Sequence, residues 1–173
     1  MKIAVIGTHS TGKTTLCHDI VAALRHVGRD AQVVNEVARG SPLPVNENTS
    51  FDAQYWVLAT QIKHEIEYGT LHETIVCDRG VIDNFMYLLR RFPDKAALLT
   101  PLVLEHCKRY DLIIRTLIEK DAEKDSFRSV DQGFREEIDA MLGTFLETHG
   151  IPHVTITGND KVAKIVSLIQ EAP

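Results

Sequence analysis

The chain has 173 residues, of which 44% are hydrophobic and 25% are charged, and its formal net charge at pH 7 is −5. These proportions are those of an ordinary globular protein, and the length predicts one domain over residues 1–173. No run of Lys or Arg is longer than Arg90-Arg91. The sequence therefore lacks the basic patch of a protein that binds nucleic acid or an anionic membrane.

The cellular compartment is predicted from three further features. No apolar run approaches the roughly 18 residues of a membrane span, and the first strand begins almost at position 1, which leaves no room for a signal peptide. The cysteines at 17, 77 and 107 are scattered and form no CxxC pair, a pattern that favours reduced thiols. We expect a cytoplasmic protein with no membrane or nucleic-acid partner.

The first predicted strand, residues 3–6, leads directly into a phosphate-binding motif. Residues 7–14 read GTHSTGKT and fit G-x-x-x-x-G-K-[ST] at every fixed position, and a helix follows with apolar residues at 16, 20, 23, 24 and 27. Gly7 and Gly12 let backbone N–H groups face a phosphate at the positive end of that helix. Lys13 adds a charge for the outer phosphates, and the Thr14 hydroxyl is an oxygen ligand for Mg²⁺.

The motif therefore predicts a nucleoside triphosphate site, with ATP and Mg²⁺ as the expected ligands. Its expected members are Gly7, His9, Ser10, Thr11, Gly12, Lys13, Thr14 and Thr15. His9 occupies a variable position of the motif, so we expect a neutral loop residue there rather than a catalytic base.

The second strand, expected at residues 31–34, ends beside Glu36, with Arg39 three positions further on. Ligands of parallel sheets bind beyond the carboxyl ends of the strands. A carboxylate there can position an acceptor hydroxyl and take its proton. The alternative is a surface glutamate that pairs with Arg39.

A polar loop at 41–49 precedes a helix that Thr49 or Ser50 can cap and that Gly69 is expected to end. Its predicted apolar stripe consists of Phe51, Tyr55, Leu58, Ile62 and Ile66. Tyr55 and Trp56 could stack on an acceptor, but aromatic residues at helical spacing belong more often to a core.

The third strand, residues 74–77, runs into Asp78-Arg79-Gly80. Asp78 is expected to hold Mg²⁺ together with Thr14, directly or through water. It could also cap the helix that follows, and the two roles are compatible. The Arg79 fork is expected to orient the acceptor hydroxyl or the transferring phosphoryl group.

The second half continues the alternation of helices and strands. Helices are expected around 82–89, from Thr100-Pro101 to Lys108, at 134–146 and at 162–169, and strands at 112–114 and 153–156. The polar segment 119–130, between the strand at 112–114 and the helix at 134–146, is expected to be a lid whose Arg128 closes on the β- and γ-phosphates. The alternative is that Arg128 is a solvated charge in an exposed loop. Lys120, Lys124 and Arg135 are weaker candidates for the same role.

The alternation predicts an α/β fold of the P-loop NTPase type, with a five-stranded parallel sheet between two helical layers. The chain also resembles the P-loop kinase group that includes the ribosylnicotinamide kinase domain of bacterial NAD-synthesis regulators, whose members are often labelled AAA-type ATPases. The residues that carry the resemblance are the P-loop, Glu36 to Arg39, Asp78 to Gly80 with Asp83 and Tyr87, and Arg128 to Asp131 with Phe134-Arg135.

This resemblance implies strand order 2-3-1-4-5 and transfer of phosphate from Mg·ATP to a small hydroxyl acceptor, for example a nucleoside such as nicotinamide riboside. It places the acceptor near Glu36 and Asp78, and the lid at Arg128. Deoxynucleoside kinases are similar in plan, and there the acid after strand two is taken as the base.

The alternative function is an ATP-binding switch or slow ATPase that acts on a protein partner. No Asn-Lys-x-Asp motif follows a late strand, which disfavours a GTPase. The sequence predicts neither the acceptor nor the oligomeric state.

Overall fold

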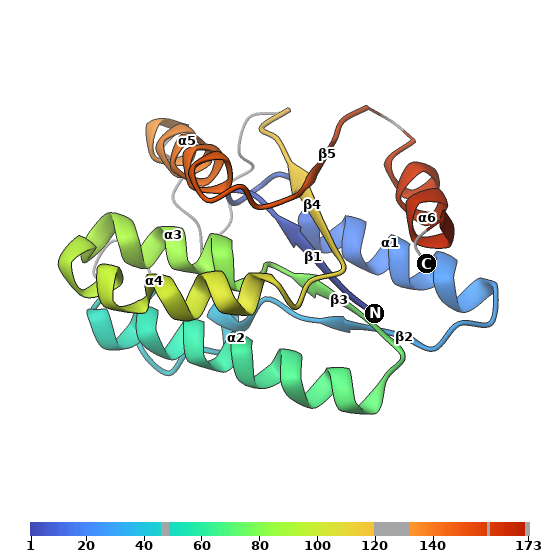
Figure 1. Cartoon of the computed structure of the whole chain (residues 1–173), viewed down its shortest axis with the longest axis horizontal. Coiled ribbons are helices and arrows are strands. Elements are labelled where there is room, and N and C mark those ends of the chain that lie inside the picture. Colours follow the sequence, from blue (N-terminus) through green and yellow to red (C-terminus); the bar gives the residue numbers. More distant parts are fainter. Residues whose placement is uncertain (46–48, 120–131, 159, 172–173) are drawn as a thin grey trace.

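The computed structural model describes residues 1–45, 49–119, 132–158 and 160–171 (Figure 1). Strands and helices alternate along most of the chain. In order they are β1 (Lys2–Ile6), α1 (Lys13–His26), β2 (Ala31–Val34), the 3-10 helix η1 (Val37–Gly40), α2 (Phe51–Leu71), β3 (Thr74–Asp78), α3 (Val81–Arg91), α4 (Pro93–Cys107), β4 (Leu112–Thr116), α5 (Gln132–Thr148), β5 (Val154–Ile156) and α6 (Lys161–Glu171).

The five strands form one parallel sheet in the order β2-β3-β1-β4-β5, which confirms the predicted topology. Helices α1 and α6 cover one face of the sheet, and α2 to α5 lie on the other (Figure 1). Because the strands are parallel, their carboxyl ends share one edge. This arrangement brings the P-loop, Glu36 and Asp78 to the same edge, because the P-loop follows β1, Glu36 follows β2 and Asp78 ends β3.

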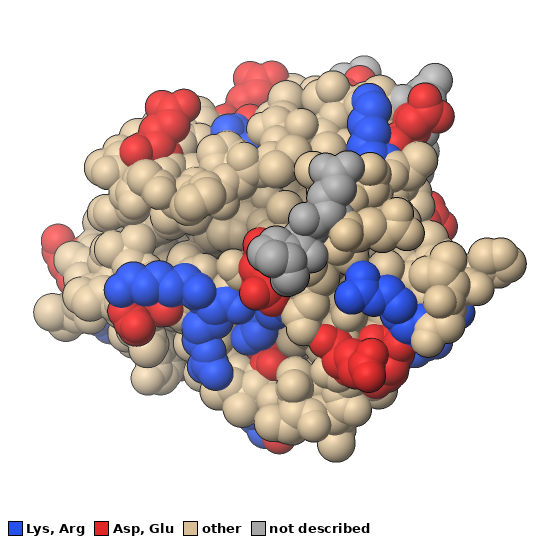
Figure 2. All heavy atoms as spheres, turned by 45° about the vertical axis from the view of Figure 1, so that its right-hand side comes forward, with Lys and Arg blue, Asp and Glu red and all other residues tan. Residues whose placement is uncertain are grey.

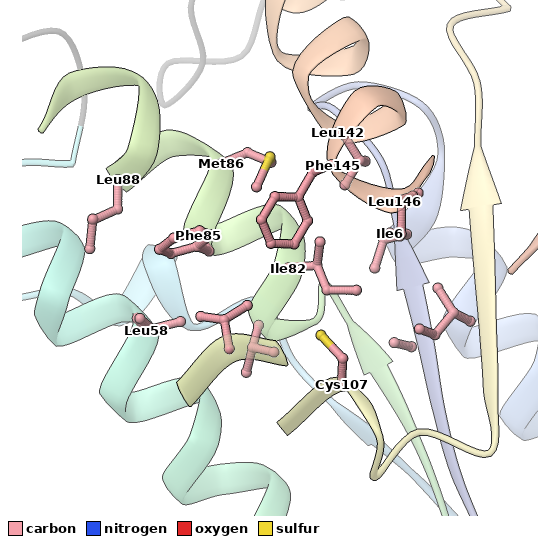
Figure 3. Close-up of a cluster of buried hydrophobic side chains, with 14 of the residues drawn as sticks. Ile6, Leu58, Ile82, Phe85, Met86, Leu88, Cys107, Leu142, Phe145 and Leu146 are labelled. Atoms are coloured by element: carbon pink, nitrogen blue, oxygen red, sulfur yellow. The ribbon is translucent and has the colours of Figure 1, made fainter. Parts of the chain in front are cut away.

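The larger hydrophobic core lies between the sheet and the helices α2 to α5 (Figure 3). Phe85 of α3 packs on Phe145 of α5 with ring centroids 5.7 Å apart. On the opposite face, Ile20 and Leu24 of α1 are fully buried in a second core that includes Ile165 of α6. Both faces of the sheet are therefore covered, as the nearly continuous apolar strand sequences indicate.

Helix α4 differs from the sequence-based prediction. It begins at Pro93, not at Thr100-Pro101, and Pro101 lies inside it. Pro93 stands in the first turn, where its missing N–H leaves no helical hydrogen bond unmade. The helix is also exposed on one side, where Leu98 is 82% accessible. The prediction was wrong because it took the second proline as the start.

Helix α2 differs in its end and in its buried face. Ser50 caps it, since its Oγ accepts the Ala53 N–H at 3.1 Å, but the helix continues past Gly69 to Leu71. Its buried residues are Ala53, Gln54, Val57, Leu58, Gln61 and Glu65, whereas Tyr55 and Ile66 of the predicted stripe are exposed.

In the described part of the chain, no helix combines the length and the apolar character needed to cross a membrane.

The surface carries charges of both signs. On the face drawn in Figure 2, Lys and Arg side chains lie beside Asp and Glu side chains in small groups. This arrangement agrees with a modest net charge of −5.

Candidate active site at the carboxyl edge of the sheet

The P-loop between β1 and α1 has the backbone shape that the sequence predicts. Gly7 and Gly12 have φ angles of 147° and 79°, which are accessible to glycine at little cost. A Cβ atom at Gly7 would lie 2.5 Å from Oγ1 and 2.6 Å from the carbonyl oxygen of Thr116, at the end of β4. Gly7 is therefore required both by its backbone angle and by the close approach of β4.

Thr116 is a residue that the sequence analysis missed. Its hydroxyl lies 3.1 Å from the carbonyl oxygen of Ile6 and 2.7 Å from the hydroxyl of Thr11. Thr11 in turn lies 3.1 Å from the carbonyl oxygen of Thr8. The end of β4 thus holds both sides of the loop. The available signal was its position at the carboxyl end of a strand, directly after the apolar run 112–114 and Arg115.

Lys13 lies under the loop and is 5% exposed. Its ammonium donates to the carbonyl oxygen of Thr8 and, at 3.3 Å, to the hydroxyl of Thr11. Burial, and next the positive charge of Arg79, lower the pKa of Lys13 to about 7. The amine is thus poised for an anion that would restore its charge.

Thr14 and Asp78 meet across the site. The Thr14 hydroxyl donates to Oδ2 of Asp78 at 2.6 Å, and Asp78 is the last residue of β3. A hydroxyl and a carboxylate are oxygen ligands of the type that Mg²⁺ prefers, so this pair fits the expected metal. The helix cap considered for Asp78 is made instead by Asp83, whose Oδ1 accepts the Gly80 N–H at 2.7 Å.

Glu36 and Arg79 form an ion pair between the ends of β2 and β3. The Arg79 Nε donates to Oε1 of Glu36 at 2.7 Å, and both side chains are largely buried. Arg39 contacts the other oxygen of the same carboxylate at 3.0 Å from its more exposed side. The structure therefore contains the predicted Glu36–Arg39 contact, but it also joins Glu36 to Arg79 and so to the turn that follows Asp78.

Helix α3 contributes two further groups to this cluster. The Nη1 of Arg79 lies 3.4 Å from Oδ2 of Asp83, and the guanidinium lies 5.4 Å from the centre of the Tyr87 ring. Burial raises the pKa of Asp83 to about 6, against the opposing charges of Arg79 and Lys13. Arg79 is therefore paired with two carboxylates, Glu36 and Asp83, from two different elements.

Helix α5 approaches the P-loop from the other side. The Nη2 of Arg135, a fully buried residue, lies 3.4 Å from the carbonyl oxygen of Ser10, and Phe134 stacks on His9 with centroids 6.0 Å apart. Arg135 was predicted only as a weaker candidate, since its burial cannot be read from its position in a polar stretch. Arg128 and the lid segment from 120 onward lie outside the described residues.

A pocket of about 540 Å³ adjoins Glu36. It lies between η1 and α2, and its wall includes Glu36, Val37, Gly40, Trp56 and Thr60. Trp56 is half-buried there and Tyr55 is 46% exposed. The core position favoured for these two aromatic residues is therefore not what the structure shows.

Comparisons with known proteins agree with this architecture. A family model described as an AAA domain matches residues 2–161. A sequence search among curated proteins finds no match. Among solved structures, deoxyadenosine kinase from M. mycoides with bound dATP is 17% identical, with a TM-score of 0.68 over 99% of this chain and 100% of that chain.

The NadR protein in complex with NR is also 17% identical, with a TM-score of 0.76 over 99% of this chain and 51% of that chain. The present chain thus spans about half the length of NadR. A further structure, NadR in complex with NAD and AMP-PNP, has a TM-score of 0.70 at 16% identity. At these identities the similarity shows the fold, which is that of P-loop kinases.

Proposed function

The chain belongs to the AAA domain family, and from the geometry of its site we propose that it transfers the γ-phosphate of Mg·ATP to a hydroxyl of a small nucleoside-type acceptor. The observation that carries this proposal is the Glu36–Arg79 pair, whose Nε–Oε1 distance is 2.7 Å. The pair holds the Glu36 carboxylate beside the turn that follows Asp78, which supports a role for Glu36 as the group that receives the proton of the acceptor hydroxyl. The structural similarity to deoxyadenosine kinase and to NadR in complex with NR supports the same class of acceptor.

Binding of the donor falls to the P-loop and Lys13. The loop amides and the start of α1 provide N–H donors and a positive dipole end for the phosphates. Lys13, released from the carbonyl oxygen of Thr8, supplies its charge to the outer phosphates. Thr14 and Asp78 would hold Mg²⁺, which when bound offsets the negative charge on the phosphates.

Transfer requires that the acceptor hydroxyl lose its proton as its oxygen attacks the γ-phosphorus. An oxygen of Glu36 receives the proton, the new O–P bond forms, and the bond from the γ-phosphorus to the β–γ bridging oxygen breaks to release ADP. Arg79 holds Glu36 in place through Nε. The pocket between η1 and α2 borders Glu36 and offers Trp56 as a stacking surface, which suits a planar base.

The experiment that tests the proposal is ADP production from Mg·ATP with a panel of ribosides and deoxyribosides, nicotinamide riboside included. An acceptor-free reaction and the Lys13→Ala variant serve as controls. We expect one class of acceptor to stimulate ADP formation strongly and Lys13→Ala to abolish it. A flat panel above a slow basal rate would contradict a kinase and favour an ATP-dependent switch.

A first prediction concerns the assignment of Glu36. Glu36→Gln keeps the shape of the side chain but removes the proton acceptor, so kcat should fall by about 10²–10⁴ while the Kd for ATP stays nearly constant. Arg39→Gln is the matched control, because Arg39 touches the same carboxylate from the exposed side, and its kcat should change far less. If Glu36→Gln weakened ATP binding as much as turnover, the assignment of Glu36 to the acceptor half of the site would be wrong.

A further inference from the structure

Arg79 has a backbone conformation that residues with a side chain rarely adopt. Its φ angle is 83°, in the left-handed region, and the residue is not a glycine. Such a conformation costs free energy and persists only where the surroundings hold it. The Arg79 N–H donates to the carbonyl oxygen of Val5 at 3.2 Å. The carbonyl of Arg79 and the N–H of Val81, further along the turn, are each bound by a side chain.

Those two side chains come from elements far apart in the sequence. The Nε2 of Gln61, on α2, donates to the carbonyl oxygen of Arg79 at 2.9 Å. The hydroxyl of Tyr110, between α4 and β4, accepts the N–H of Val81 at 2.9 Å. The strained residue is therefore held on its C-terminal side by two side chains.

Both of these side chains are anchored on one oxygen of Glu65. Its Oε1 accepts from Gln61 Nε2 at 2.9 Å and from the Tyr110 hydroxyl at 2.7 Å. Tyr110 thus uses its single proton on Glu65, so that its oxygen accepts from Val81, and Gln61 has one amide proton for each of its two partners. The orientation of both side chains is determined by these contacts.

The other oxygen of Glu65 completes the anchor. Oε2 accepts from Nε2 of His106 at 2.7 Å and lies 3.2 Å from Nζ of Lys2. Burial by itself raises the pKa of Glu65, but hydrogen bonds from His106 and Gln61, the charge of Lys2 and the Tyr110 hydroxyl together leave it below its usual range. Glu65 is therefore an ionised acceptor, which keeps its partners donating to it.

We propose that Gln61 and Tyr110, anchored on Glu65, are positioning residues that hold the Arg79 turn so that the guanidinium meets Glu36. Glu65 and Gln61 are fully buried, and an apolar contact between α2 and α3 would avoid the cost of desolvating them. Two of the contacts from this network end on the backbone of the turn that carries Arg79. The effect on turnover rests on the proposed function, whereas the effect on the Glu36–Arg79 pair does not.

The first test is a double-mutant cycle measured by chemical denaturation. Gln61→Leu and Glu36→Gln are made singly and together, with Tyr110→Phe in place of Gln61→Leu as a second, isosteric version of the cycle. Gln61 and Glu36 are linked through Arg79, so the destabilisation caused by Glu36→Gln should shrink by about half or more when Gln61 or Tyr110 has been changed. Additive losses in the cycle would overturn the proposal.

A control variant in the same helix, Ser50→Ala, tests whether the coupling is specific to the Arg79 turn. Ser50→Ala removes the cap at the start of α2 without touching the Arg79 turn, so its effect should add to that of Glu36→Gln. Coupling of equal size with Ser50→Ala would mean that any loss in α2 weakens the pair, which also contradicts a positioning role.

The second test is kinetic and uses the acceptor that stimulates the wild-type protein. Tyr110→Phe should lower kcat by about 10-fold or more, while the acceptor KM and the Kd for ATP change by less than about twofold, because a displaced group harms the transition state first. Ile138→Val, a core change in α5, should leave kcat unchanged. A kcat within twofold of wild type for Tyr110→Phe would refute the role in turnover. If no acceptor stimulates the wild-type protein, the proposed function fails, and the denaturation cycle still decides whether this network positions Arg79.

Discussion

The amine of Lys13 is buried against the loop that it is proposed to serve. With a pKa of about 7, lowered by burial and then by Arg79, it loses its proton more readily than an ordinary lysine. The carboxylates of Asp83, Asp78 and Glu36 act in the opposite direction. Burial and the charged side chains around the P-loop thus determine how readily Lys13 loses its proton, and the sequence motif alone does not indicate this. Because a bound triphosphate places negative charge beside the amine, it should raise this pKa again.

The second prediction follows from the direction of that shift. At pH 8.5 most Lys13 amines in the ATP-free protein lack their proton, so binding of Mg·ATP should take up close to one proton per site. Calorimetry in buffers of different ionisation enthalpy measures this uptake. Asp83→Asn is the control, because Asp83 titrates near pH 6 and its removal should leave the uptake at pH 8.5 undiminished. Binding heat that does not depend on the buffer would contradict the prediction.

Two elements show how tertiary contacts decide the role of a residue within a helix or loop. Helix α2 buries Gln61 and Glu65, although their polarity assigns them to solvent in an apolar-stripe analysis. Thr11 of the P-loop is hydrogen-bonded to Thr116 of β4, 105 residues further along the sequence. In both cases the deciding partner lies on another element, and no local periodicity reveals it.

The third prediction compares two glycines with positive φ. Gly28, at the end of α1, has a φ of 80° and no atom within 4 Å of an added Cβ. Gly28→Ala should therefore cost only about 1 kcal/mol of unfolding free energy, from the left-handed conformation. Gly7→Ala adds a collision with Thr116 and should cost about 2–4 kcal/mol, with loss of ATP binding. Denaturant titrations of both variants measure the difference. Equal costs would show that the loop can move away from β4.

Over the whole molecule, the site draws on elements from both sides of the sheet centre. Glu36 follows β2 and Asp78 ends β3, while Thr116 ends β4 and Arg135 lies in α5. The P-loop, which would bind the ligand, is thus in contact with residues from both halves of the sheet. Its binding free energy should stabilise the folded chain as a whole and not one loop.

The fourth prediction is a thermal shift. Mg·ATP at about 100 times its Kd should add about 2.7 kcal/mol to the free energy of unfolding, which corresponds to a rise in Tm of about 5–10 °C for a chain of this size. Differential scanning calorimetry measures the shift. Lys13→Ala should lose most of it, because the outer phosphates lose their fixed charge. An equal shift in Lys13→Ala would remove this lysine from the proposed donor site.

Local pattern was sufficient for the P-loop, the alternation of strands and helices, and the placement of Glu36 and Asp78 at strand ends. These features depend on residues close together in the sequence, and parallel strands then bring their carboxyl ends to one edge. The strand order itself came from the family resemblance, and the structure confirms it.

The tertiary structure alone decided how those groups meet. The left-handed conformation of Arg79 is held by contacts between separate elements. The Arg79–Glu36 pair, the bond from Tyr110 to the buried Glu65 and the Arg135 contact with the P-loop likewise join residues from separate elements. Each depends on the direction of a side chain across the packed interior. That direction is set by contacts between distant segments, so it is absent from the periodicity of any one of them.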